Sequence, residues 1–178
     1  MSDTGRTAIL KAARRAFALR PYANVTLRSI ASDAGVSAAL IVKHFGGKDQ
    51  LFEAVADFTS DADLLFDAPR AELGRHMVET LLVTRRASNS SPLVRVIFGI
   101  GAGDERALLL DRFREQVTTR LEKLLDGHDP RLRAELILSQ FLGMSATISI
   151  HPGGRTTTAD VSRIVDLYAP AIQALVDG

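Results

Sequence analysis

The sequence predicts an all-α protein of about nine helices, in which a small N-terminal domain precedes a larger helical C-terminal domain. Apolar residues recur at intervals of three and four through most of the 178 residues, and no segment shows the strict alternation of a half-buried strand. Glycine and proline stand mainly between these periodic segments, where they end helices. We therefore expect one domain over residues 1–55 and a second over residues 56–178.

The composition is that of a globular protein without disulfides or metal-binding thiols. Hydrophobic residues make up 46% and charged residues 24% of the chain, which is ordinary for a globular domain. Cysteine is absent, which removes disulfide bonds, thiol catalysis and zinc-finger ligands. No apolar run is long enough for a membrane span, and the first residues lack the apolar core of a signal peptide. We therefore expect a cytoplasmic protein.

Positive charge gathers at the N-terminal end of the chain. Residues 1–55 carry eight Lys and Arg against four Asp and Glu, a net charge of +4, whereas the remainder carries −3. A basic head on a slightly acidic body is typical of a phosphate-binding module attached to another domain. A solvated helix face with a chance asymmetry would give the same count, so charge alone leaves both interpretations open.

The first predicted helix spans residues 6–19 and is amphipathic. Lys11, Arg14 and Arg15 lie on its polar side. Its apolar stripe consists of Ile9, Ala12, Ala13, Ala16 and Phe17. Pro21 disfavours continued helix at the residue before it, so a loop is expected next.

Two short helices around a glycine-containing turn are predicted after this loop. Thr26 can cap the first, because its hydroxyl can accept hydrogen bonds from the amides of the first turn. Gly35 stands at the turn, where a residue without Cβ adopts a positive φ at little cost. Ser37 caps the second helix, over residues 38–44. Such a pair is typical of the DNA-binding helix-turn-helix, whose second helix enters the major groove.

The rest of the chain is predicted to be helical throughout. Asp129 is expected to cap the penultimate helix, with Pro130 in its first position. Thr157 or Thr158 is expected to cap the last helix, and Pro170 to kink it. The expected helices span residues 48 to about 65, 70–86, 93–100, 104–125, 131–150 and 159–176.

Four aspartates crowd the segment that joins the two domains. Asp57, Asp61, Asp63 and Asp67 stand near apolar side chains and could suggest a metal site. No histidine or calcium-loop spacing accompanies them, so we interpret the segment as an acidic, solvated linker. No metal and no cofactor are expected.

The order of residues around the turn is more specific than a general helix-turn-helix. It closely resembles the N-terminal domain of the tetracycline-repressor (TetR) family of transcriptional regulators, and the resemblance covers roughly the first 55 residues. The matching positions are Thr26, Arg28, Ile30, Ala31, Ala34, Gly35, Val36, Ser37, His44, Phe45, Lys48, Leu51 and Phe52. Beyond them, only the helical architecture and length agree with the family.

The resemblance implies an operator-binding surface on these two helices. In the family the second helix lies in the major groove, where short side chains at its start allow close approach to bases. Carried over to this chain, the DNA-binding residues are Thr26, Arg28, Ser37, Ala38, Ala39, Lys43, His44 and Lys48. Alternative roles remain for several: Thr26 as a cap only, His44 as a packing residue, and Arg28 and Lys48 as solvated charges.

One position departs from the family pattern. Val42 stands where members commonly carry an aromatic residue, usually tyrosine, whose hydroxyl binds a DNA phosphate. Valine cannot make this bond, so one phosphate contact is missing. We expect Lys43, the next residue, to supply a replacement.

The resemblance also implies a homodimer formed by the last two long helices, and a small-molecule effector bound in the second domain. For the dimer interface the residues are Ser139, Gly143, Ala146, Ile164, Tyr168 and Ile172, of which the first three are small and permit close helix packing. For the effector pocket, expected to be mainly hydrophobic, they are His76, Met77, Arg95, Phe98, Phe113, Gln140, Phe141 and Met144. Both sets are also compatible with ordinary internal core.

The function that the resemblance implies is a ligand-responsive regulator, most readily a repressor that leaves its palindromic operator when the effector binds. The sequence leaves activation open and identifies neither effector nor operator. An enzyme is disfavoured, because the four histidines are scattered without metal spacing and no nucleophile–base pair stands out. The alternative is a helical ligand- or partner-binding dimer whose head does not read DNA.

Overall fold

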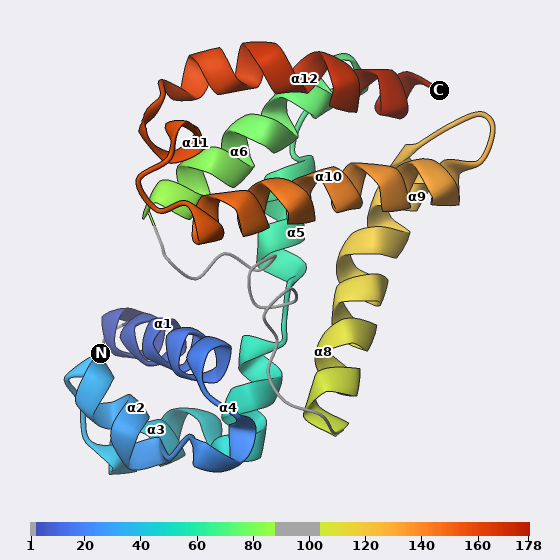
Figure 1. Cartoon of the computed structure of the whole chain (residues 1–178). Helices are drawn as coiled ribbons and strands as arrows, with labels where there is room; N and C mark the ends of the chain where they lie inside the picture. The colour runs from blue at the N-terminus through green and yellow to red at the C-terminus, as the bar shows by residue number, and fades with distance from the viewer. Residues whose placement is uncertain (1–2, 88–103) are drawn as a thin grey trace.

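The computed structural model describes residues 3–87 and 104–178, and every regular element in these ranges is helical (Figure 1). The predicted all-α class is therefore confirmed. Nine helices remain when α8 and α9 are taken as one rod and the single turn α11 is left out. The helix expected over residues 93–100 lies outside the described residues.

The N-terminal part packs α1 across three short helices (Figure 1). Phe17 is fully buried at its centre, where its ring stacks on Tyr22 at 5.6 Å and meets Phe52 edge-on at 5.1 Å, between ring centroids. The elements are α1 (Asp3–Leu19), a 3₁₀ turn (Tyr22–Asn24), α2 (Leu27–Ala34), α3 (Ala38–Phe45) and α4 (Lys48–Val55).

Local capping fixes where α2 and α3 begin and end. The Thr26 hydroxyl accepts from the Ser29 amide at 3.1 Å, and the Ser29 hydroxyl lies 3.3 Å from the Thr26 amide, which completes a capping box. Gly35 ends α2 in the left-handed conformation with φ of 67°. The Ser37 hydroxyl then accepts from the Leu40 amide at 3.2 Å. All three predicted roles are confirmed.

The prediction of one helix from Lys48 to about Leu65 is wrong. The first part, α4, ends at Val55, and a separate helix α5 covers Thr59–Phe66. Between them, the Asp57 carboxylate accepts from the Thr59 amide at 3.0 Å, and the Gln116 side-chain oxygen accepts from the Phe58 amide at 2.7 Å. Side chains therefore satisfy amides that a continuous helix would bond to its own carbonyls.

The C-terminal part gathers α6, α10 and α12 on one side, while the α8–α9 rod stands beside α5 (Figure 1). A π-helical segment (Arg114–Thr118) joins the two parts of that rod. The remaining elements are a 3₁₀ turn (Arg70–Glu72), α6 (Leu73–Ala87), α8 (Asp104–Phe113), α9 (Thr119–Leu124), α10 (Pro130–Ile150), the single turn α11 (Arg155–Thr158) and α12 (Val161–Asp177).

Two predicted caps differ in the structure. Asp129 precedes α10 but makes no side-chain capping bond, because its backbone is left-handed with φ of 48°. The cap of α12 is Asp160, whose carboxylate accepts from the Ser162 amide at 3.2 Å, and not Thr157 or Thr158. α12 continues through Pro170 as one helix.

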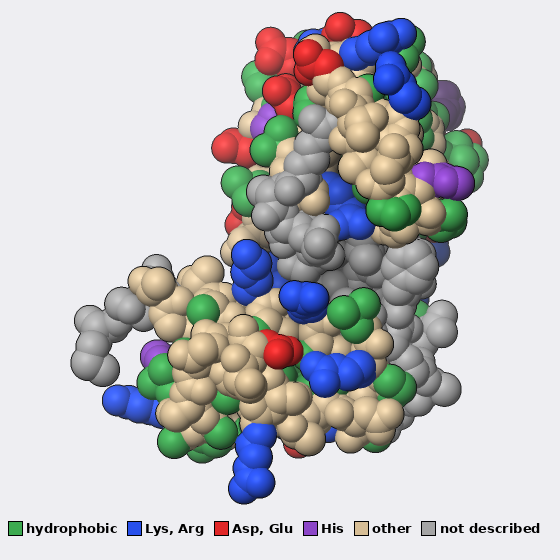
Figure 2. Space-filling view, turned by 60° about the vertical axis from the view of Figure 1, so that its left-hand side comes forward, with side chains coloured by type: hydrophobic (Ala, Val, Ile, Leu, Met, Phe, Trp, Pro, Cys, Tyr) green, Lys and Arg blue, Asp and Glu red, His purple; other side chains and the backbone are tan. Residues whose placement is uncertain are grey.

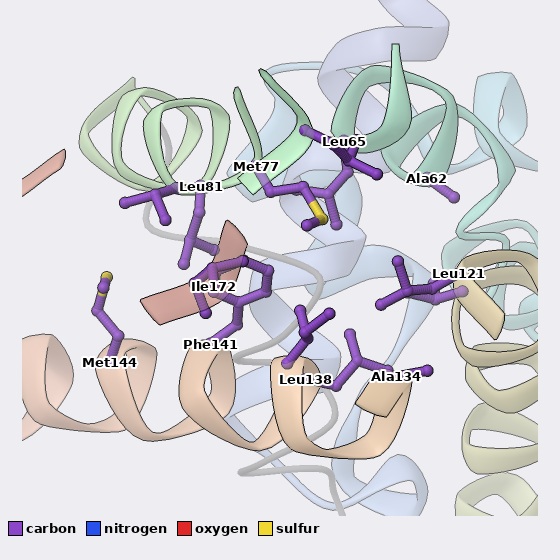
Figure 3. Close-up of a cluster of buried hydrophobic side chains, with 14 of the residues drawn as sticks. Ala62, Leu65, Met77, Leu81, Leu121, Ala134, Leu138, Phe141, Met144 and Ile172 are labelled. Atoms are coloured by element: carbon purple, nitrogen blue, oxygen red, sulfur yellow. The ribbon is translucent and has the colours of Figure 1, made fainter. Parts of the chain in front are cut away.

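The buried apolar side chains form two clusters. One belongs to α1–α4 and has Phe17, Ile30 and Ile41 near its centre. The second lies among the helices that follow α4, and Figure 3 shows its side chains pointing into the space between α5, α6, α9 and α10. Its fully buried large side chains include Phe58, Met77, Leu82, Leu121, Ile137 and Phe141.

Arg133 anchors the end of α12 through hydrogen bonds to backbone carbonyls. Its side chain is 8% exposed and donates to the carbonyls of His128 at 2.8 Å, Leu175 at 3.2 Å and Val176 at 3.3 Å. These acceptors include the last carbonyls of α12, which have no partner within the helix. Arg70 adds a second bond to the Val176 carbonyl, at 3.0 Å.

Gly74 gives the sharpest test of this packing, because α6 meets α12 there with no room for a side chain. A Cβ at position 74 would lie 2.6 Å from the backbone nitrogen of Gln173 and 2.8 Å from its Cα. We expect Gly74→Ala to lower the free energy of unfolding by about 1–3 kcal/mol, measured by urea denaturation. Gly5→Ala is the matched control: its Cβ would make only ordinary contact with Leu40, at 3.8 Å. An undiminished stability of Gly74→Ala would contradict the close approach.

Candidate nucleic-acid interface

The predicted DNA-facing residues lie on the N-terminal part of the protein, around α2 and α3. Lys and Arg side chains project from this lower part in Figure 2, whereas acidic side chains gather on the upper part. Six of the predicted residues are exposed and two are half-buried. The exposed ones are Thr26, Arg28, Ser37, Ala39, Lys43 and His44, and the half-buried ones are Ala38 and Lys48.

The outer face of α3 is exposed, and the helix itself carries no acidic side chain. Ile41 is fully buried and fixes which side of the helix faces the core. Ala39, Val42 and Lys43 are exposed, with Val42 at 49%. Residues 34–47 contain no acidic side chain at all. A surface of this kind can approach polyanionic DNA without like-charge repulsion.

The two acids that stand next before and next after α3 in the sequence have partners within the head. Asp33 lies 3.7 Å from the Arg20 guanidinium, and Asp49 accepts a hydrogen bond from the Tyr22 hydroxyl. Arg28 and Lys43 form no ion pair among the residues that the structure describes. Their charges are therefore available to phosphates or base edges.

Lys48 and His44, both predicted to contact DNA, lie near aromatic rings of the head. The Lys48 ammonium lies 4.0 Å from the centroid of the Tyr22 ring, a cation–π distance. The His44 side chain is exposed, with its ring 6.3 Å from that of Phe45. Tyr22 thus orients the Lys48 side chain at the start of α4.

The predicted effector residues are placed mainly in packed core. Met77 and Phe141 are fully buried, Phe113 is 7% exposed and Met144 8%. The His76 ring bonds the Leu64 carbonyl at 2.8 Å. Gln140 is half-buried, and its backbone carbonyl accepts from the Tyr168 hydroxyl at 3.2 Å. Arg95 and Phe98 lie outside the described residues.

A surface pocket of about 630 Å³ lies at the C-terminal ends of α5 and α9. None of the predicted effector residues lines it. Its walls are Asp63, Leu64, Phe66, Asp67, Arg120, Lys123 and Leu124. The pocket is mixed in charge, since Arg120 already pairs with Asp63 at 2.7 Å.

The predicted interface residues divide between surface and core. Ser139 and Gly143 are exposed, whereas Ala146, Ile164 and Tyr168 are half-buried. Ile172 is fully buried in the core of its own chain, so its side chain cannot reach a partner. The predicted set did not include three large apolar side chains that are exposed on the last two long helices, namely Leu132 and Ile150 on α10 and Leu167 on α12. Leu132 stands four residues before the exposed Leu136, which itself precedes Ser139 by three, so this helical spacing was visible in the sequence.

The α4–α5 break brings the head and the α8–α9 rod together. Phe58 meets Phe113 edge-on at 5.4 Å between ring centroids, and its amide bonds Gln116. The hydrogen bond from the Thr59 amide lowers the pKa of the Asp57 carboxyl; partial burial opposes this, and Arg112 and Arg14 assist it. Asp57 is therefore held as a carboxylate beside cationic side chains from both parts.

Two further features bear on function. No group of three or more His, Cys, Asp or Glu side chains that could hold a metal occurs within residues 3–87 and 104–178. Over the same ranges, every helix is too short or too polar to span a membrane.

Both parts of the chain match known sequence families. Residues 9–55 match the sequence family described as bacterial regulatory proteins of the tetR family, and residues 71–176 match the tetracyclin repressor-like C-terminal domain. The nucleoid occlusion factor SlmA of Pectobacterium carotovorum is 27% identical over 138 residues, which cover 67% of this chain and 70% of SlmA.

Two solved structures share the architecture over nearly the whole chain. A TetR-family regulator from Streptomyces coelicolor is 25% identical with a TM-score of 0.59, covering 97% of this chain and 94% of that protein. AibR, crystallised with isovaleryl coenzyme A and operator DNA, is 21% identical with a TM-score of 0.60, covering 98% of both chains.

The Asp57 geometry predicts a pH-dependent contribution to stability. Because its folded pKa lies below the ordinary value of 3.8, the contribution is present above that value and is lost as pH falls through the folded pKa. Asp57→Asn should therefore be less stable than the wild type near neutral pH, and the difference should shrink below about pH 4. Urea unfolding at several pH values measures this. A stability difference between wild type and Asp57→Asn that stays constant with pH would contradict the prediction. Asp61→Asn, which removes an aspartate from α5, is the control.

Proposed function

This chain belongs to the TetR family of bacterial regulators, and from that premise we propose that it binds a palindromic operator as a homodimer and responds to a small effector. Membership makes it a DNA-binding regulator of transcription and not an enzyme. The proposed outcome of effector binding is release of the operator. Such DNA binding implies a place beside the chromosome in the cytoplasm.

The observation that carries the proposal is the exposed, acid-free outer face of α3 after a capped turn. Ser37 and Gly35 fix the angle between α2 and α3, and Lys43 extends from the exposed side. In this arrangement α3 enters the major groove, and Ala38 and Ala39 approach the base edges. Thr26, at the N-terminus of α2, lies where a helix dipole favours a phosphate.

The proposed dimer uses the exposed apolar side chains of α10 and α12. Leu132, Leu136, Ser139, Gly143 and Ile150 follow one another at intervals of three, four and seven, so they form a single stripe along α10. Leu167 on α12 is 77% exposed, the greatest exposure among the large apolar side chains described. Pairing these faces about a twofold axis would bury them in a four-helix interface. The two α3 helices would then read half-sites about 34–36 Å apart, or somewhat more.

An effector domain is supported by the division of the chain into a basic head and a separately packed body. The fold neighbour AibR was crystallised with both an acyl coenzyme A and operator DNA, so one fold accommodates both partners. In our proposal the body of this chain has the corresponding role, with an effector of its own.

Selection of purified protein against a random pool of duplex DNA tests the function directly. We expect enrichment of a palindromic sequence, because a symmetric dimer presents two identical readers. Absence of enrichment above salt-sensitive, non-specific binding would instead favour the alternative of a ligand- or partner-binding dimer whose head does not read DNA.

Lys43→Ala tests the proposed replacement for the missing tyrosine contact. The substitution should weaken operator binding and reduce the slope of log affinity against log salt by about one unit, as expected for one lost phosphate contact. Lys123→Ala, an exposed lysine on α9, removes the same charge from the body and should leave the slope unchanged. An unaltered slope in Lys43→Ala would show that Lys43 does not replace the phosphate contact that Val42 cannot make.

Leu167→Glu tests the proposed interface. A buried, unpaired carboxylate at a dimer interface is strongly unfavourable, so we expect a monomer by size-exclusion chromatography with light scattering, at a concentration where the wild type is dimeric. Leu64→Glu, at a position 61% exposed on α5, is the control and should leave the mass unchanged. A dimeric Leu167→Glu would place the interface elsewhere.

A further inference from the structure

The α8–α9 rod buries apolar side chains at strict intervals of four residues. Leu109, Phe113, Val117 and Leu121 are each at most 7% exposed and belong to one buried cluster. A regular α-helix turns by about 100° per residue, so each interval of four overshoots a full turn by about 40°. Across the three intervals the stripe would drift by about 120° and carry its last member away from the core.

The π-helical segment Arg114–Thr118 offsets this drift. The Thr119 amide donates to the Arg114 carbonyl, so this turn holds one residue more than an α-helical turn. One extra residue sets the following part of the helix back by about 100°, which cancels most of the drift. The spacing of the apolar residues therefore favours the wide turn, which keeps the buried side chains of α8 and α9 facing the same core.

The same turn brings Gln116 to the junction between α4 and α5. Its side-chain oxygen accepts from the Phe58 amide at 2.7 Å, while Phe113, just before the turn, meets the Phe58 ring edge-on. Phe113 and Gln116 stand three residues apart. Without the extra residue they would stand two apart, and side chains two apart on an α-helix do not face the same neighbour. Both contacts with Phe58 therefore depend on the wide turn.

Phe58 lies where the chain passes from one buried cluster to the other. Val55, three residues earlier, belongs to the cluster of the head, whereas Phe58 belongs to that of the body. From the side of the rod, Leu108 of α8 packs against the head cluster. Figure 1 shows the rod running from the level of the head along α5. The rod therefore contacts the head and also holds the chain that leads out of it.

We propose that Gln116, held in place by the π-helical turn, is the residue that positions the DNA-reading head relative to the body. Its bond joins a side chain of the rod to the backbone of the α4–α5 junction, so it transmits the register of the rod to the head. This inference deepens the proposed function and rests on it for one consequence. In a dimer, the position of each head sets the separation of the two α3 helices and hence the spacing of the half-sites.

Distances between spin labels in the purified full-length protein test the positioning in the absence of DNA. The chain contains no cysteine, so nitroxides on Ser32→Cys in α2 and Glu79→Cys in α6 label only the head and the body. Both positions are exposed. Labelled chains are mixed with an excess of unlabelled chains, so that double electron–electron resonance reports the distance within one chain.

Gln116→Ala should broaden the distribution of this distance, because the head loses the bond that orients it. Gln116→Glu keeps an oxygen acceptor and should retain the narrow distribution of the wild type. Glu115→Ala, at an exposed position of the same turn, is the matched control and should retain it as well. Deletion of Glu115 should shift the mean distance, because the rod then returns to the regular α-helical register.

Four results would overturn the proposal: a broad distribution in the wild type, a wild-type distribution in Gln116→Ala, or a broadening equal to that of Gln116→Ala in either Gln116→Glu or Glu115→Ala. If the deletion variant does not fold, the three substitutions decide the matter, and thermal unfolding of each variant shows that it is folded.

Selection against a random pool of duplex DNA tests the consequence for operator binding. We expect the wild type to enrich palindromes of one half-site spacing, and Gln116→Ala to enrich a range of spacings. The affinity of Gln116→Ala for the wild-type spacing should fall roughly fivefold, the equivalent of one neutral hydrogen bond. A single, unchanged spacing in Gln116→Ala would contradict the proposal. If the wild type enriches no palindrome, the proposed operator is rejected, whereas the spin-label distances still decide whether Gln116 positions the head.

Discussion

The hydrogen bond from the Phe58 amide to the Gln116 side chain joins the two parts of this molecule at a place where the chain could have continued as one helix. Gln116 stands in the π-helical segment of the α8–α9 rod, and such segments often occur at functional positions. This bond holds the segment between the end of α4 and the start of α5. In the same segment the Phe58 ring packs edge-on against Phe113. The position of α3 relative to the body therefore depends on how this junction is held. An effector that shifts the rod would change that position without touching the head.

The elements that could be predicted from the sequence are those whose causes are local. Thr26, Gly35 and Ser37 act within a few residues of themselves, so the turn motif and its caps were readable directly. The break after α4 was not, because one of its determinants is a glutamine 58 residues away. Asp129 was also mispredicted. Its residue type favours an N-cap, but its left-handed backbone keeps the side chain from capping α10.

The candidate sites show a similar division. Exposure of Ala39 and Lys43 follows from the amphipathic pattern of α3, and the pattern was sufficient to identify its outer face. Ile172 shows why the body was harder to interpret. It stands on a helix with apolar residues on more than one face, and only the packing of α12 against α6 and α10 decides which face is inside.

The carbonyl ligands of Arg133 have a consequence for how the protein responds to its solvent. Its charge is stabilised by peptide dipoles in a buried place, so added salt cannot compete for it as it would compete for phosphate contacts at the proposed DNA-binding face. The end of α12, beside the proposed dimer surface, is thus fastened by an interaction that is nearly indifferent to ionic strength. In a cell whose internal salt rises under osmotic stress, such a molecule would loosen its hold on DNA while its own architecture stayed intact.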